Sequence, residues 1–60
     1  MRFQLEIICD NTAFDDSPEE EVSRILRELS TRVWNGAAPD DGLVFDTNGN
    51  SVGTWRFGHE

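Results

Sequence analysis

The fold is decided by residues 17–34, which read SPEEEVSRILRELSTRVW. This stretch opens with Ser17, a good N-cap residue, and Pro18, which suits the first position of a helix. Glu20 follows Ser17 by three residues and completes a capping box, and the acidic residues beside it favour the positive end of the helix dipole. The stretch therefore predicts a helix that begins at Pro18.

One side of this predicted helix is apolar. Apolar residues recur every three or four positions, as in a helix that packs on a sheet; they are Val22, Ile25, Leu26, Leu29 and Val33. The helix is expected to end near Trp34, because Asn35-Gly36 offers a C-cap and Pro39 cannot continue a helix. Trp34 is expected to cap the edge of the core, and the alternative is an exposed interface anchor.

The residues before the helix predict a strand and a loop. Residues 2–9 alternate between apolar and polar side chains, which is typical of a strand with one face on a core; the apolar positions are Phe3, Leu5, Ile7 and Cys9. Cys9 is expected to be a small core residue and not a nucleophile, since no base lies near it. Residues 10–17 are rich in turn formers, and Phe14 within them is expected to fold back onto the core.

The last third of the chain predicts a hairpin around residues 47–49. A three-residue loop pairs Phe45 with Ser51, whereas a two-residue turn would pair Phe45 with Val52. A one-residue slip exchanges the two faces of a strand. The longer loop is favoured because it gathers the large apolar residues of the hairpin on one face; these are Leu43, Phe45, Trp55 and Phe57. It requires Gly49 in the left-handed conformation of a bulged loop.

The elements follow one another as strand 2–9, helix 18–34, strand 43–46 and strand 51–57. This order predicts an α+β fold of the β-α-β-β type, with one helix packed on a three-stranded antiparallel sheet whose last strand is central. The alternative places the first two strands side by side and parallel. A chain of this length forms one domain with a small core, so we expect residues 1–60 to be a single domain.

The charge of the chain restricts its partners. Twelve acidic residues face five basic ones, all of them arginine, and the net charge is −7. Such a chain is repelled by phosphate backbones and anionic lipid, so direct binding to nucleic acid or to a membrane is not expected. Basic protein surfaces are the natural partners. The simpler interpretation is that the charge only keeps a small domain soluble.

The acidic residues are concentrated between residues 10 and 21, a stretch that contains no basic residue. Capping and the helix dipole account for the glutamates of the first helical turn but not for the aspartates before them. Asp40 and Asp41 are expected to add to the same field from the next loop. The candidate partner-binding residues are therefore Asp10, Asp15, Asp16, Glu19, Glu20, Glu21, Asp40 and Asp41. On a rigid frame, these carboxylates could occupy phosphate positions in a basic groove. The alternative is a solvated acidic edge.

Little in the sequence supports chemistry at a metal or a catalytic site. One cysteine and one histidine, His59, cannot supply the four ligands of a zinc site or an internal disulfide. Residues 46–50 resemble the opening of a calcium loop, but Ser51 and Phe57 stand where such a loop needs Gly and Glu. No acid and base pair has distinct environments. We expect neither an enzyme nor a bound cofactor or metal.

Three features favour the cytoplasm. Residues 1–6 are too polar for a signal peptide, and no apolar run approaches the roughly 20 residues of a membrane span. A lone thiol also suits a reducing compartment.

Three segments of the chain, FQLEI to DNTAF (residues 3–14), EEVSRIL (20–26) and DTNGNSVG (46–53), resemble very small bacteriophage and prophage proteins. Some acidic mobile-element proteins of this size and layout are anti-CRISPR inhibitors, including inhibitors of the type I-C Cascade surveillance complex. The resemblance implies an acidic surface, carried over here only to residues 10–21, that occupies the DNA-binding and PAM-reading region of the large Cascade subunit. We expect the chain to be a monomer in the cytoplasm of the bacterial host. The alternative is a phage accessory or structural interaction protein without inhibitory activity, which would self-associate through Trp34 and Phe14 or through an open sheet edge.

Overall fold

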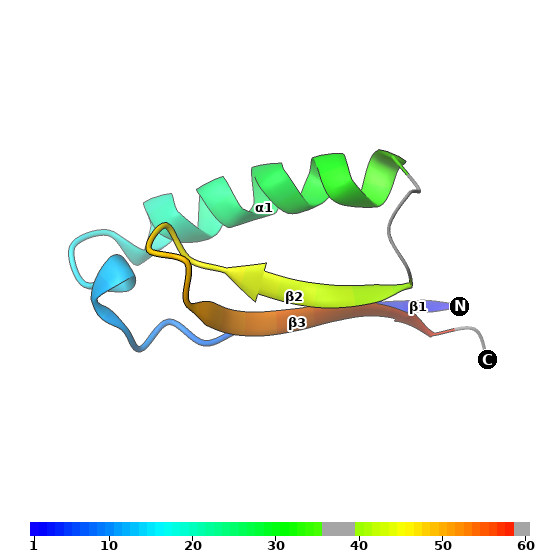
Figure 1. Cartoon of the computed structure of the whole chain (residues 1–60), viewed down its shortest axis with the longest axis horizontal. Coiled ribbons are helices and arrows are strands. Elements are labelled where there is room, and N and C mark those ends of the chain that lie inside the picture. Colours follow the sequence, from blue (N-terminus) through cyan, green and yellow to red (C-terminus); the bar gives the residue numbers. More distant parts are fainter. Residues whose placement is uncertain (36–39, 59–60) are drawn as a thin grey trace.

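The helix lies across one face of a three-stranded sheet (Figure 1). The structure is a computed structural model and describes residues 1–35 and 40–58. The sheet order is β1-β3-β2, and both neighbouring pairs are antiparallel. The predicted α+β fold is therefore confirmed, and the parallel alternative is wrong. The elements are β1 (Arg2–Ile7), the 3-10 helix η1 (Thr12–Phe14), α1 (Pro18–Asn35), β2 (Asp41–Phe45) and β3 (Ser51–Gly58).

Helix α1 begins at Pro18, as predicted, and the Glu21 N–H donates to the Ser17 carbonyl oxygen at 3.3 Å. The Ser17 hydroxyl donates to the Glu19 carboxylate at 3.5 Å, and among the described residues Glu20 makes no capping-box bond. The start of the helix therefore depends on Pro18 and on the acidic first turn more than on a reciprocal cap.

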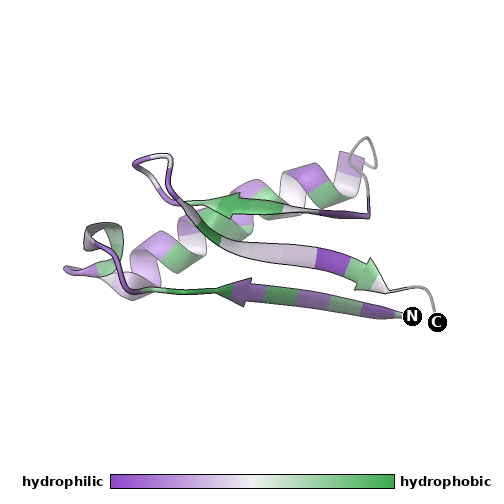
Figure 2. Ribbon diagram, turned by 60° about the horizontal axis from the view of Figure 1, so that its bottom comes forward, coloured by the Kyte–Doolittle hydropathy of each residue, from purple (hydrophilic) through white to green (hydrophobic). Residues whose placement is uncertain are grey.

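The core lies between α1 and the sheet and is closed at one end by η1. Its buried apolar side chains are Phe14, Ile25, Leu29, Val44, Val52 and Trp55. Phe14 folds back onto the core as predicted. The apolar stripe of α1 is narrower than predicted, because Leu26 is exposed. Along β1 apolar and polar residues alternate, as Figure 2 shows.

The hairpin has the predicted loop but a different register beyond it. Phe45 pairs with Ser51, and Gly49 has a φ of 85°, which confirms the three-residue loop with a left-handed glycine. The next pair, however, joins Val44 to Gly53, so Val52 is an extra residue on β3. This irregularity is a β-bulge, and it shifts every later pair by one residue.

The bulge reverses which side of β2 faces the core. Val44 is fully buried, whereas Leu43 and Phe45 are exposed on the other face of the sheet. The prediction that Leu43, Phe45, Trp55 and Phe57 share one face is therefore wrong, because it assumed a regular ladder after the loop. A Cβ on Gly53 would overlap the Glu6 carbonyl oxygen, so β1 and β3 approach closely at the bulge only because residue 53 is glycine.

Two further predictions about single side chains are wrong. β1 ends at Ile7, and Cys9 lies beyond it as an exposed free cysteine instead of in the core. Trp34 is 88% exposed and does not cap the core. It follows the half-buried Val33 by one helical position, which turns its side chain about 100° away from the sheet.

Candidate functional site

One end of the molecule carries most of the candidate acidic residues. The loop before α1, the first turn of α1 and the hairpin loop lie together there (Figure 1). We call the following five exposed residues of this region the acidic end: Asp10, Asp15, Asp16, Glu19 and Glu20. The structure thus brings together five of the eight residues that the sequence singled out.

Asp40 and Asp41 lie at the opposite end, where β2 begins (Figure 1). The Phe57 N–H donates to the Asp40 carbonyl oxygen at 2.7 Å, and Asp41 lies opposite Arg56 in the sheet. A five-residue strand spans about 16 Å, which exceeds the Debye length of about 8 Å at physiological salt. The expectation that these two residues add to the field of the acidic end is therefore wrong.

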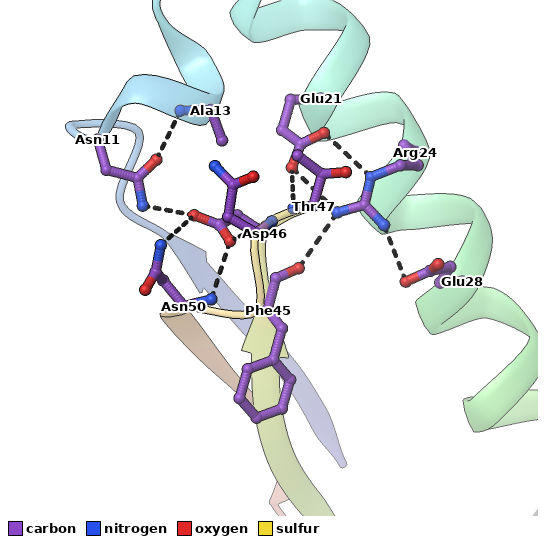
Figure 3. Close-up of polar contacts among 10 residues, drawn as sticks. Asn11, Ala13, Glu21, Arg24, Glu28, Phe45, Asp46, Thr47 and Asn50 are labelled. Atoms are coloured by element: carbon purple, nitrogen blue, oxygen red, sulfur yellow. Dashed lines mark hydrogen bonds and ion pairs between the residues drawn. The ribbon is translucent and has the colours of Figure 1, made fainter.

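Glu21, the remaining candidate, is buried and bound inside the molecule. Its carboxylate accepts two hydrogen bonds from the Arg24 guanidinium, both at 3.0 Å, and one from the Thr47 N–H at 2.7 Å. Arg24 also pairs with Glu28 at 3.0 Å and donates to the Phe45 carbonyl oxygen at 3.3 Å (Figure 3). Glu21 therefore joins α1 to the hairpin loop and does not belong to the exposed surface.

The bond from Arg24 lowers the pKa of Glu21, and the bond from the Thr47 N–H adds to this effect. Burial and the nearby Asp46 act in the opposite direction but do not prevail. Hydrogen bonds to an ionised carboxylate favour its charged form. Both bonds thus stabilise the ionised form of Glu21 in the folded domain.

Asp46 is a second buried carboxylate and was not predicted to matter. Its Oδ1 accepts from the N–H groups of Asn48 and Asn50, at 2.8 and 2.9 Å. Its Oδ2 accepts from the side-chain amides of Asn11 and Asn50, at 2.6 and 3.3 Å (Figure 3). Burial acts to raise the pKa of Asp46, but the bonds from Asn50, Asn11 and Asn48 outweigh it and lower the pKa.

Asn11 carries this network into the acidic end. Its side-chain oxygen accepts from the Ala13 N–H at 3.1 Å and so caps η1, while its amide is bound to Asp46. The sequence did contain a signal for the hairpin half of this network, because Asp and Asn side chains commonly bond the backbone two residues on. Its partner in the first loop lies 35 residues away along the chain and has no local signature.

The acidic end has no basic counterpart in the part of the chain that the structure describes. The ion pairs found there join Arg24 to Glu21 and to Glu28, and neither involves a residue of the acidic end. Glu19 accepts a hydrogen bond from the Ser17 hydroxyl, which carries no charge. The five carboxylates therefore face solvent without internal neutralisation.

An open hollow of about 310 Å³ lies beside the first turn of α1. It is lined by Ala13, Asp16, Ser17, Glu20 and Glu21. Ligand pockets range from about 300 to 1,000 Å³ and are mostly apolar, whereas this hollow is small and largely polar.

Residues 1–35 and 40–58 contain no group of three or more His, Cys, Asp or Glu side chains placed to hold a metal ion. Over the same ranges, no helix has both the length and the apolar character needed to cross a membrane. No family model, curated protein or solved structure matches the chain.

Proposed function

We propose that this protein is an inhibitor that binds the basic, nucleic-acid-binding surface of another protein through its acidic end. The observation that carries the proposal is the contrast between two kinds of acid at one end of the molecule. Glu21 and Asp46 are buried and hold the loops in place. Around them, the five carboxylates of the acidic end are exposed and unpaired among the described residues.

A frame of this kind supports charge mimicry for a physical reason. A basic groove that holds nucleic acid is lined with Lys and Arg, which gain free energy by neutralising phosphates and releasing counterions. The hydrogen bonds of Glu21 and Asp46 already order the backbone that carries the exposed carboxylates, so binding such a groove has to order only their side chains. Complementary charge also speeds association and disfavours partners of like charge. The net charge of −7 argues against direct binding to nucleic acid.

The proposed target follows from the resemblance to small phage proteins. Among the anti-CRISPR inhibitors that the chain resembles, the target is a Cascade-type surveillance complex, and the blocked site is the DNA-binding and PAM-reading region of its large subunit. The protein would act in the cytoplasm of the bacterial host, as a binding protein and not as an enzyme. The hollow lined by Asp16 and Glu20 would receive one basic side chain of the target.

The direct test uses purified type I-C Cascade and a target DNA duplex. The unaltered protein is expected to co-elute with the complex in gel filtration and to abolish DNA binding in a mobility-shift assay. The test variant carries Asp15→Asn, Asp16→Asn and Glu20→Gln, which leaves the buried Glu21 intact. It is expected to require at least about tenfold more protein for the same inhibition, because three central charges of the acidic end are lost.

A matched control separates position from total charge. The control variant carries Asp40→Asn, Asp41→Asn and Glu28→Gln, so each variant removes three negative charges and changes the net charge from −7 to −4. Circular dichroism checks that both variants fold. The proposal predicts that the control inhibits like the unaltered protein. Equal losses in the two variants, or no loss in the test variant, would contradict the mimic mechanism.

A second candidate function is that of a phage accessory or structural interaction module without inhibitory activity. It is favoured by large apolar side chains that lie on the surface, namely Trp34, Leu43 and Phe45. Exposed aromatic residues can anchor a protein interface. If the unaltered protein neither co-elutes with Cascade nor affects DNA binding, inhibition of Cascade is rejected and this second function is favoured.

A further inference from the structure

β1 is an edge strand, because the sheet order is β1-β3-β2, and no strand pairs with its outer side among the described residues. On that side the Cys9 thiol makes a weak contact, donating to the Ile7 carbonyl oxygen at 4.0 Å. The Ile8 N–H donates to the Val52 carbonyl oxygen at 2.8 Å, which continues the ladder between β1 and β3. Backbone groups of an antiparallel strand alternate between its two sides. The even-numbered residues of β1 therefore face β3, and the N–H and C=O groups of Phe3, Leu5 and Ile7 face outward.

The apolar side of β1 is only partly covered. Phe3 lies on the core side of the sheet with its ring centroid 4.9 Å from that of Phe57 and 6.1 Å from that of Trp55, yet it is 42% exposed. Leu5 and Ile7 are half-buried. Helix α1 packs mainly against β2 and η1, near the other edge of the sheet (Figure 2). A strip of apolar surface thus runs along the free edge.

Natural edge strands are commonly protected by proline, by a bulge or by charged side chains, lysine above all. β1 has no proline, lysine or bulge, since its sequence is RFQLEI and its pairing with β3 is regular. Its charged residues are one base and one acid, Arg2 and Glu6, placed symmetrically about Gln4. A strand of this kind is complementary to an antiparallel copy of itself.

We propose that two copies of this chain pair through β1 to form a dimer with a continuous six-stranded sheet. With the two-fold axis at Gln4, Arg2 of each copy lies opposite Glu6 of the other, and Phe3 lies opposite Leu5. Opposite charges on facing strands stabilise a sheet, and like charges destabilise it. Both members of the Phe3 and Leu5 pair direct their backbone groups outward, so they can exchange hydrogen bonds.

The charges select this register over its neighbour. If one copy slides so that Leu5 lies opposite Leu5, the outward-facing backbone groups still meet. Arg2 then lies opposite Ile8, and Glu6 lies opposite Gln4, so no carboxylate faces the guanidinium. A slide in the other sense places Arg2 opposite Gln4 and shortens the paired segment. Only the register centred on Gln4 joins both charges to a partner of opposite sign.

The same arrangement limits repulsion between two chains of net charge −7. β1 leads directly into the acidic end, and antiparallel pairing sends the two acidic ends in opposite directions (Figure 1). Both helices lie on one side of the extended sheet, where Phe3 and Leu5 of the two copies cover one another. The proposed dimer differs from the monomer expected from the sequence. It does not depend on the proposed inhibitory function, since the acidic ends remain exposed.

Sedimentation equilibrium over a range of concentrations, in reducing buffer because Cys9 is exposed, tests the dimer. Glu6→Arg and Arg2→Glu each place like charges opposite each other twice, and each is expected to weaken dimerisation by about tenfold or more. An equal mixture of the two variants restores both opposite-charge pairs and is expected to form heterodimers. Glu20→Arg and Arg27→Glu make the same charge changes on the exposed surface of α1 and are expected to have little effect.

Two further measurements test the register. In a Cys9→Ser background, Gln4→Cys places two thiols across the axis in a pair that is not hydrogen-bonded, where Cα atoms lie about 4.5 Å apart, so air oxidation is expected to link the dimer. The matched variant Glu6→Cys, Cys9→Ser is expected to stay unlinked. In the unaltered protein, the amide protons of Phe3, Leu5 and Ile7 are expected to exchange slowly at dimer-forming concentrations and quickly on dilution.

A monomer at every concentration would overturn the proposal. So would a dimer that is insensitive to both β1 charge reversals, or rapid exchange of the three amides within the dimer, since either result places the interface elsewhere. None of these outcomes bears on inhibition of Cascade, which is measured with variants of the acidic end.

Discussion

Phe14 and Trp34 lie at opposite ends of the molecule, yet Phe14 is 3% exposed and Trp34 is 88% exposed. The backbone that presents Phe14 is held by hydrogen bonds, since Asn11 caps η1 and binds the buried Asp46. Trp34 belongs to the last turn of α1 and points away from the sheet. For these two aromatic residues, burial is therefore decided by the path of the backbone and not by the hydrophobicity of the side chain.

The carboxylates at the same end of the molecule as Phe14 also divide into buried and exposed groups. Glu21 and Asp46 are 7% and 4% exposed, and each accepts hydrogen bonds from a segment distant in sequence. Asp15, Asp16 and Glu20 lie around them on the surface. Identical functional groups thus lie in two environments, since the buried pair fixes the loops and the exposed set faces solvent.

The largest effect on stability is expected from removing the buried aromatic side chain of Phe14. Phe14→Ala is expected to lower the free energy of unfolding by about 3–5 kcal/mol, the usual cost of truncating a buried phenylalanine. Small domains have total stabilities of about 5–15 kcal/mol, so this variant is expected to be largely unfolded at moderate urea. Urea titration followed by tryptophan fluorescence measures it. A loss below about 1 kcal/mol would mean that η1 does not seal the core.

Acid is expected to have the next largest effect, through the two buried carboxylates. The pKa values of Glu21 and Asp46 are lowered in the folded protein from 4.5 and 3.8. Their contribution to stability is therefore complete above these ordinary values and is lost as the pH falls through the lower folded values. Thermal unfolding between pH 2 and pH 7 is expected to show the midpoint falling below about pH 4.

Single substitutions test whether the two buried carboxylates, and not the exposed ones, cause the loss of stability at low pH. Asp46→Asn and Glu21→Gln are each expected to lower the midpoint at neutral pH and to flatten its fall in acid, because the titrating carboxylate is gone. Asp16→Asn, on the exposed surface, serves as the matched control. An unchanged acid profile in both buried variants would show that other groups govern acid unfolding.

Substitutions of Gly49 in the hairpin loop, at the same end as Phe14, are expected to have a smaller effect on stability. Gly49 has a φ of 85° and no atom within 4 Å of the place a Cβ would occupy. Gly49→Ala is therefore expected to cost about 1–2 kcal/mol through backbone strain alone, without a steric clash. Gly49→Asn is expected to cost less, since asparagine tolerates the left-handed region. Equal losses for the two variants in urea titration would contradict this account.

The smallest effect on stability is expected for the exposed Trp34, in the last turn of α1. Trp34→Ala is expected to change the free energy of unfolding by no more than about 0.5 kcal/mol, as for most surface substitutions. Acrylamide quenching provides a spectroscopic check, because the exposed Trp34 is expected to be quenched readily and the buried Trp55 to be protected. A loss near that of Phe14→Ala would show that Trp34 packs on the domain, and the comparison between the two ends would fail.

Much of the fold could be predicted because its signals are local. The first residues of α1, its apolar spacing and the left-handed glycine at position 49 depend on neighbours along the chain. The order strand, helix, strand, strand then favoured an antiparallel sheet with the last strand in the centre. Of the candidate site, the five residues of the acidic end could be chosen because they are close in sequence, whereas Asp40 and Asp41 were misplaced because the length of β2 separates them.

The three strands, helix α1, their order and the loop that pairs Phe45 with Ser51 can be read from the amino-acid sequence, because each follows from the preferences of adjacent residues. The bulge at Val52, which exchanges the faces of β2, and the inward position of Glu21 and Asp46 arise only when the elements pack together. They depend on groups remote in sequence, such as the Thr47 N–H for Glu21 and the Asn11 amide for Asp46. Such contacts exist only once the chain has packed.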